Sequence, residues 1–198
     1  MPGPGLMQPG FNDPVLDSQQ VFKAALKSLT NPGLVIDLPV LPPSPEPLYP
    51  GTAALLLTLL DLDTLVWLDP EADTPEVADW LAFHCGCPLT ADPGKAAFAV
   101  ISDGRNLPGL ELFSVGAEDS PEQSATVIIQ VGELIRDRGR SLSGPGIEDR
   151  IDLKVLGLAD LFWEFFNRNG GLFPQGLDFL LTGPGRICGL PRTTKVVS

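Results

Sequence analysis

The residue types best suited to metal chemistry lie in one short segment, His84-Cys85-Gly-Cys87. Imidazole and thiolate groups are ordinary zinc ligands, but a closed zinc site needs four of them. The chain has one other thiol, Cys188, and no second histidine. We therefore interpret His84 as the end of a helix, where it can bond a last-turn carbonyl. It shares that helix face with Val77, Trp80 and Leu81. No metal site is predicted.

Two glycine–proline segments, Gly144-Pro-Gly146 and Gly183-Pro-Gly185, resemble fragments of phosphate-binding loops. Neither completes a dinucleotide-binding or Walker A pattern, and each proline lacks the N–H that such a loop offers. Turns are the better interpretation. Asp61 and Asp63 could form a carboxylate pair, but aspartate is at home in turns, and we favour a turn. With one histidine, any catalytic triad would have to use His84.

Three arginines, Arg136, Arg138 and Arg140, form a small basic stripe. At strand spacing all three would point the same way and could grip a phosphate or an acidic partner surface. Asp137 and Gly139 interrupt them, so the favoured interpretation is solvated charge on a loop.

The composition limits the possible functions. The 198 residues suffice for one domain, and the formal net charge of −12 opposes binding to nucleic acid or to anionic lipid. The longest apolar run, within residues 53–60, is far shorter than the roughly 20 residues that span a bilayer. The first residues lack the features of a secretory signal. Three cysteines in such a chain suggest reduced thiols and a cytoplasmic location.

Alternating helical and strand patterns must position these groups. We expect a mobile tail over residues 1–12 and one α/β domain over 13–198. A helix starting near Asp17 should use Phe22, Ala25, Leu26 and Leu29 as its apolar face, with Lys23 and Lys27 on the other. Residues 34–38 fit a strand and 39–50 an extended loop. Next we expect a buried helix over residues 52–60 and a strand over 64–68. A helix from Pro75 to about His84 should follow.

The second half of the chain continues the alternation. Residues 96–101 and 125–131 are continuous apolar runs, as in central strands covered on both faces. A late helix should dock through Leu158, Leu161, Phe162 and Phe165 and end at Asn169-Gly-Gly171. Residues 177–182 and 187–190 predict a β-hairpin. The fold class is therefore α/β, with a mixed sheet between helical layers.

The last segment resembles a known family. Phe173-Pro-Gln-Gly-Leu-Asp178 and Leu190-Pro-Arg-Thr-Thr194 are similar to the C-terminal signature of the H subunits of phosphonate carbon–phosphorus (C–P) lyase systems. Further segments agree in the same order, from about Asp17 to Val196. They are Phe22-Lys-Ala-Ala-Leu-Lys with Asn31-Pro-Gly33, Leu57-Thr-Leu-Leu-Asp61 with Val66-Trp-Leu68, Leu81-Ala-Phe-His84, Ala97-Phe-Ala-Val100, residues 125–131, and Leu142-Ser-Gly-Pro-Gly-Ile147. Cys85, Cys87, the proline-rich stretch 39–50 and the aromatic helix 162–166 look particular to this chain.

The resemblance implies an α/β/α sandwich like the large domain of pyridoxal-phosphate-dependent transferases, without a cofactor. It implies a homodimer when isolated and a complex with subunits G, I and J in the cytoplasm. That complex couples a phosphonate to the ribose of ATP, displacing adenine, before the C–P bond is broken on subunit J. The H subunit is expected to support this chemistry without a catalytic residue of its own.

The candidate ligand or interface residues are His84, Asp178, Arg192, Thr193, Thr194, Trp163 and Phe166. Asp178 interrupts an apolar strand and Arg192 is its natural partner, although simple hairpin pairing matches 178 to 191 and so predicts a bulge or register shift. Trp163 and Phe166 lie off the docking stripe and should contact another chain. The alternative function is an independent nucleotide- or phosphonate-binding protein or transferase with a ligand site at a dimer interface.

Overall fold

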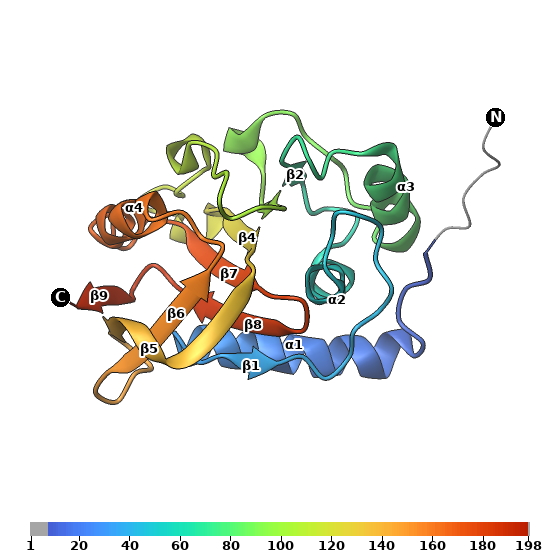
Figure 1. Cartoon of the computed structure of the whole chain (residues 1–198). Helices are drawn as coiled ribbons and strands as arrows, with labels where there is room; N and C mark the ends of the chain where they lie inside the picture. The colour runs from blue at the N-terminus through green and yellow to red at the C-terminus, as the bar shows by residue number, and fades with distance from the viewer. Residues whose placement is uncertain (1–7, 198) are drawn as a thin grey trace.

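A six-stranded sheet forms the centre of the computed structural model, which describes residues 8–197 (Figure 1). Its strands run in the order β1-β8-β7-β4-β3-β2. β2, β3, β4 and β7 are mutually parallel, while β8 is antiparallel to both β7 and β1. The strands are β1 (Ile36–Asp37), β2 (Val66–Leu68), β3 (Phe98–Ile101), β4 (Thr126–Gln130), β7 (Asp178–Thr182) and β8 (Arg186–Leu190).

The central position of β3 and β4 follows from their residues. Both are continuous apolar runs, so both faces must be covered. Along β4, Ile128 faces one hydrophobic core, while Val127 and Ile129 face the other. The predicted central strands and the predicted C-terminal hairpin are confirmed.

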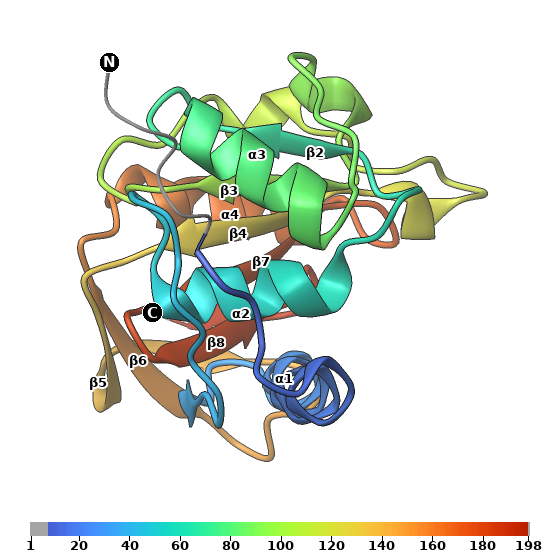
Figure 2. The same ribbon diagram turned by 90° about the vertical axis from the view of Figure 1, so that its right-hand side faces the viewer.

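Three helices cover one face of this sheet: α1 (Pro14–Thr30), α2 (Pro50–Leu59) and α3 (Pro75–His84), as Figure 2 shows. Each begins with a proline, whose missing N–H costs nothing in the first turn. Side chains cap α1 and α3: Asp13 accepts from the backbone of Val15 and Leu16, and Thr74 accepts from Val77. The sequence placed the start of α1 one turn too late, at Asp17.

The other face carries α4 (Leu161–Gly170) and a three-stranded antiparallel sheet in the order β6-β5-β9. Its strands are β5 (Glu133–Ser143), β6 (Ile151–Leu156) and β9 (Lys195–Val197). This second sheet was not predicted. Short 3₁₀ turns, η1 (Pro93–Lys95), η2 (Leu110–Leu112) and η3 (Pro121–Gln123), lie in the loops before and after β3.

The arginine stripe lies in β5, and the loop interpretation of it is wrong. Arg136 and Arg140 both pair with Leu153 of β6, so residues 137–139 bulge out of the ladder. Asp137 and Gly139 adopt positive φ there. Arg136 and Arg140 therefore do not share simple strand alternation with Arg138.

The outward faces of two helices differ from the prediction. In α1 the buried residues are Val21, Ala24, Ala25 and Ser28, whereas Phe22 and Leu26 are exposed. In α4 the buried residues include Phe162, Trp163 and Phe166, whereas Leu161 is exposed. Both helices are apolar on more than one side, so the sequence alone did not decide which stripe meets the sheet.

Within residues 8–197, no helix combines the length and the apolar character that crossing a bilayer requires. Residues 1–7 of the predicted tail lie outside the described part. Residues 8–12 lead to α1 beside α3, where Phe11 packs against the core.

Candidate functional site

Arg192 is the most highly bonded side chain among the candidates. Its guanidinium Nη2 lies 2.6 Å from Asp178 Oδ2, and its backbone N–H donates to Asp178 Oδ1 at 2.8 Å. Nη1 donates to the carbonyls of Pro121 and Pro174 at 3.0 and 3.1 Å, and Nη2 donates to Ser124 Oγ. The side chain is 12% exposed. The guanidinium N–H groups of Arg192, which could otherwise bind an anionic ligand, are therefore bonded within the chain.

The predicted Asp178–Arg192 pair is confirmed, but the predicted bulge is wrong. β7 and β8 pair regularly, with Phe179 opposite Leu190, which is the simple register. β8 ends at Leu190, and the chain turns through Pro191 to Thr194, where Thr194 N–H donates to the Pro191 carbonyl at 2.9 Å. Arg192 thus lies beyond the ladder, and strand alternation no longer fixes its direction.

The two threonines after Arg192 belong to the same turn. Thr194 is buried, and its Oγ1 has no hydrogen-bond partner among the described residues. Thr193 is half-buried, and its carbonyl lies near Gly144. Both threonines therefore lie beside the Arg192 cluster, which consists of Arg192, Asp178, Ser124, Pro121 and Pro174.

His84 ends α3, as predicted, but its hydrogen bond differs from the expected one. Its Nε2 lies 2.9 Å from the carbonyl of Gln8, which also accepts from Trp80 Nε1 at 3.1 Å. The imidazole also contacts the rings of Trp80 and Phe83. The only histidine of the chain therefore fastens residues 8–12 to α3.

The cysteines fall into two separate places. Cys85 Sγ donates to the Leu56 carbonyl at 3.7 Å. Interaction with the neighbouring Cys87 thiol raises the pKa of Cys85, and the same interaction lowers the pKa of Cys87. Cys188 lies in the core on the other side of the sheet, where burial raises its thiol pKa to about 12. Within residues 8–197 no three histidine, cysteine or carboxylate groups are arranged to hold a metal ion.

Trp163 and Phe166 are buried inside one chain, so their predicted role at an interface is wrong. Phe166 is fully buried and stacks with Phe162 at a centroid distance of 5.7 Å, while Trp163 is 6% exposed. The guanidinium of Arg140 lies 5.4 Å above the Trp163 ring and covers it. The aromatic face of α4 is a core contact.

A row of polar residues along one edge of the main sheet was not predicted; three of them are buried, and Ser102 is half-buried. Asp69, Ser102, Gln130 and Thr182 lie at the carboxyl ends of β2, β3, β4 and β7. In open α/β sheets this edge is the usual place for a ligand. In the sequence, a polar residue stands at the end of each of these four apolar strands, and this pattern could have indicated the row.

In this chain the polar row is closed by its own hydrogen bonds. Asp69 Oδ2 accepts from the Ser102 backbone at 2.7 Å, and burial raises the pKa of Asp69. Gln130 Nε2 donates to the Pro47 and Ser102 carbonyls, each at 3.0 Å, and its Oε1 accepts from Tyr49 N–H. The proline-rich loop therefore lies over the carboxyl edge of the sheet. The polar side chains of the row stabilise this loop and the strand ends, and do not face a ligand.

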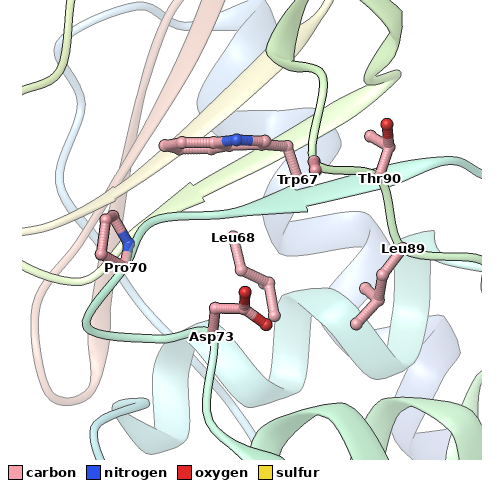
Figure 3. Close-up of a pocket in the computed structure, with 7 residues that line it drawn as sticks. Trp67, Leu68, Pro70, Asp73, Leu89 and Thr90 are labelled. Atoms are coloured by element: carbon pink, nitrogen blue, oxygen red, sulfur yellow. The ribbon is translucent and has the colours of Figure 1, made fainter.

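Several cavities open at the surface, among them one beside β2 and one along α4. One, of about 330 Å³, lies at the outer edge of β2, with Trp67 on one side of the strand and Asp73 and Leu89 on the other (Figure 3). The other, of about 600 Å³, runs along α4 between Phe165, Arg168, Leu172 and Glu111. Neither is lined by a cysteine, a histidine or a serine.

The remaining predicted groups have structural partners. Asp61 Oδ1 accepts from Asp63 N–H and Thr64 Oγ1, which confirms the turn. Gly144 and Gly146 have positive φ, as turn glycines do. Arg136 pairs with Asp37 at 3.7 Å and Arg140 with Asp160 at 3.3 Å, so two of the three stripe arginines bind their own chain.

Fold and site together define an α/β protein whose candidate polar side chains serve mainly to hold its loops in place. The chain matches, over residues 9–197, the model of a family described as bacterial phosphonate metabolism protein (PhnH). It belongs to this family.

The names of two relatives fit this assignment. The alpha-D-ribose 1-methylphosphonate 5-triphosphate synthase subunit PhnH of Rhizobium meliloti (strain 1021) is 34% identical over 186 residues, covering 94% of this chain and 93% of that protein. The putative C-P lyase subunit protein HtxG of Stutzerimonas stutzeri is 34% identical over 103 residues, covering 52% of each chain.

Proposed function

We propose that this chain is a non-catalytic subunit of a carbon–phosphorus lyase complex. It supports the ATP-dependent conversion of alkylphosphonates to ribose 1-phosphonate 5-triphosphates and the later cleavage of the C–P bond. The observation that carries the proposal is its 34% identity, over 94% of the chain, to a protein named as a subunit of ribose 1-methylphosphonate 5-triphosphate synthase.

The internal bonding of the candidate residues supports a non-catalytic role. The only histidine binds a backbone carbonyl, Arg192 is bonded to four residues, and Asp69 accepts from Ser102 and Ala72. A catalytic group needs a free atom within hydrogen-bond reach of a substrate. The hydrogen-bonding atoms of these side chains are instead bonded to other residues of the same chain.

The finer parts of the proposal concern partners, place and fold likeness. Its partners in the complex are subunits G, I and J, and the isolated chain is a homodimer, located in the cytoplasm. Its mostly parallel sheet, covered on both faces, is of the kind found in the large domain of pyridoxal-phosphate-dependent transferases. Superposition on such a domain would test this likeness directly.

Reconstitution tests the function. Purified G, I and J subunits with this chain should release adenine from ATP and methylphosphonate, and omission of this chain should abolish or strongly reduce the release. The isolated chain should release none. Release by the isolated chain would favour an independent enzyme, and full activity without this chain would remove it from the reaction.

A further inference from the structure

Cys85 and Cys87 lie on either side of one glycine at the end of α3, and the proposed function uses neither thiol. Cys85 is the C-cap residue of the helix and is half-buried, while Cys87 is 5% exposed. Both residues pack against the hydrophobic core between the sheet and the three helices that cover it. Two thiols placed so closely in the chain can be joined if the backbone between them bends.

The backbone at the end of α3 has the bend that a bond between these thiols requires. A disulfide joins residues whose Cα atoms are about 4.4–6.8 Å apart, whereas a fully extended chain separates residues i and i+2 by about 7 Å. Cys85 has right-handed helical φ and ψ, and Gly86 follows with a φ of 65°, which glycine adopts without strain. The amides of both residues donate to the Leu81 carbonyl, at 2.9 and 3.0 Å. The bend is therefore part of the helix end.

The two thiols differ in how readily they lose a proton. Interaction with the Cys87 thiol raises the pKa of Cys85, and the same interaction lowers the pKa of Cys87. The thiolate is the nucleophilic form of cysteine, so Cys87 is the group that attacks, and Cys85 keeps its proton. An accessible thiolate beside a second thiol is the arrangement of an attacking and a resolving cysteine.

Access to the pair depends on Leu62. A Cβ added to Gly86 would lie 2.5 Å from Leu62 Cδ2, so this side chain lies over the bend. Leu62 belongs to the turn between α2 and β2 and is itself 74% exposed. The bend that carries the two thiols is therefore one side chain away from solvent.

We propose that Cys85 and Cys87 form a reversible disulfide within the chain when it meets hydrogen peroxide. The Cys87 thiolate attacks one oxygen of the peroxide, the O–O bond breaks, and Cys87 sulfenic acid and hydroxide result. The Cys85 sulfur then attacks the Cys87 sulfur and forms the S–S bond, while the S–O bond breaks and the leaving oxygen departs as water with the Cys85 proton. Together the two thiols lose two electrons and two protons, and the peroxide becomes two molecules of water.

The bond changes how α3 is held against α2. In the reduced chain the Cys85 thiol donates to the Leu56 carbonyl of α2 at 3.7 Å. A sulfur bonded to Cys87 carries no hydrogen, so oxidation removes this contact. The disulfide therefore couples exposure to an oxidant to the packing of two helices that cover the sheet.

Cys188 provides a comparison within the same chain. It is fully buried in the core on the other face of the sheet, and burial raises its thiol pKa to about 12. A buried neutral thiol reacts poorly, so oxidation should be confined to the pair at the end of α3.

Mass spectrometry of the full chain, treated with a small molar excess of hydrogen peroxide, tests the proposal. The wild type should lose about 2 Da, the mass of two hydrogens, and dithiothreitol should restore the original mass. The tryptic peptide 28–95 contains Cys85 and Cys87 but not Cys188, so the whole loss should lie in this peptide. Alkylation of the oxidised chain in guanidinium should then label Cys188 alone.

Variants separate a disulfide from general oxidation. Cys85→Ser keeps a donor for the Leu56 carbonyl but removes the resolving thiol, so its Cys87 should instead gain about 16 or 32 Da as sulfenic or sulfinic acid. Leu62→Ala, which uncovers the bend, should lose the 2 Da several-fold faster than the wild type. Cys188→Ala is the matched control and should form the bond at the wild-type rate, and circular dichroism checks that each variant is folded.

Three results would overturn the proposal. They are a wild-type peptide 28–95 that keeps both thiols free while Cys188 is oxidised or the peroxide is consumed, a bond that requires Cys188, and a bond that joins two chains in a non-reducing gel. All measurements use the isolated chain, so their outcome does not depend on its proposed role in the lyase complex.

Discussion

At the scale of single residues, Arg192 holds the C-terminal part of the molecule together. One guanidinium joins the start of β7, the loop at Pro174 and the segment 121–124. Arg192→Met keeps the apolar stem but leaves the half-buried Asp178 carboxylate without its countercharge. Breaking a buried pair from one side costs about 3–5 kcal/mol, so the free energy of unfolding measured in urea should fall by that amount.

The matched control is Arg105→Met. Arg105 also pairs with an aspartate, Asp103, at 2.9 Å, but its side chain is exposed. Exposed pairs are screened by water and salt, so this variant should unfold like the wild type. Equal effects of the two substitutions would show that the Arg192 cluster contributes no more than a surface pair.

The sequence predicted the Asp178–Arg192 pair because a charge within an apolar strand demands a partner close in the chain. It did not predict the acceptor of His84, because the carbonyl of Gln8 lies 76 positions away in the sequence. The polar row Asp69, Ser102, Gln130 and Thr182 depends on strand order, which no local pattern specifies. Local pairs were predictable here, whereas contacts between distant segments were not.

At the scale of elements, α4 is anchored by its aromatic face. Phe166 is fully buried against Phe162 and Phe179, so Phe166→Ala should lower the free energy of unfolding by about 3–5 kcal/mol. Leu161→Ala, on the exposed side of the same helix, should change it by about 0.5 kcal/mol or less. Chemical denaturation of both variants checks the assignment of the faces, and a reversed order of effects would contradict it.

Helix α1 depends on a glycine in the strand beneath it. Gly189→Ala places a methyl group 2.6 Å from the Ser28 carbonyl, so α1 or β8 must shift. Overpacking of this kind costs about 1–3 kcal/mol, which thermal or urea unfolding would measure. Gly183→Ala in the adjacent turn is the control, because no atom lies closer than 4.0 Å to its added Cβ. An unchanged stability of Gly189→Ala would mean that α1 is not tightly seated on β8.

The elements that could be predicted are those with one clear pattern. The central strands β3 and β4 are uniformly apolar, and the hairpin strands β7 and β8 flank a glycine-rich turn. β5 was missed because its charged residues and Gly139 hide the two-residue period, and a bulge breaks it. The apolar faces of α1 and α4 were misassigned because each helix has two stripes, and only packing against the sheet selects one.

At the scale of the whole molecule, the described chain uses its polar groups to close its own surface. The carboxyl edge of the parallel strands, where related architectures hold a ligand, is covered by the loop that Gln130 fastens through Pro47 and Tyr49. The outward face of α1 exposes the apolar side chains of Val15, Phe22 and Leu26. The groove along α4 combines apolar side chains with the charged Glu111 and Arg168. Exposed apolar surface of this kind suits contacts with other chains better than chemistry on a small substrate.

The last prediction concerns pyridoxal phosphate, which the isolated chain should not bind despite its proposed likeness to transferases that use it. A Schiff base requires a lysine inside a pocket that also holds the phosphate. All five lysines, Lys23, Lys27, Lys95, Lys154 and Lys195, are exposed on the surface of the structure. Titration with pyridoxal phosphate, followed by gel filtration, should leave no visible absorbance band on the protein, while a pyridoxal-phosphate enzyme treated in parallel retains its own. A band that survives filtration and disappears when one particular lysine is changed to arginine would contradict the prediction and would place a cofactor site at that lysine.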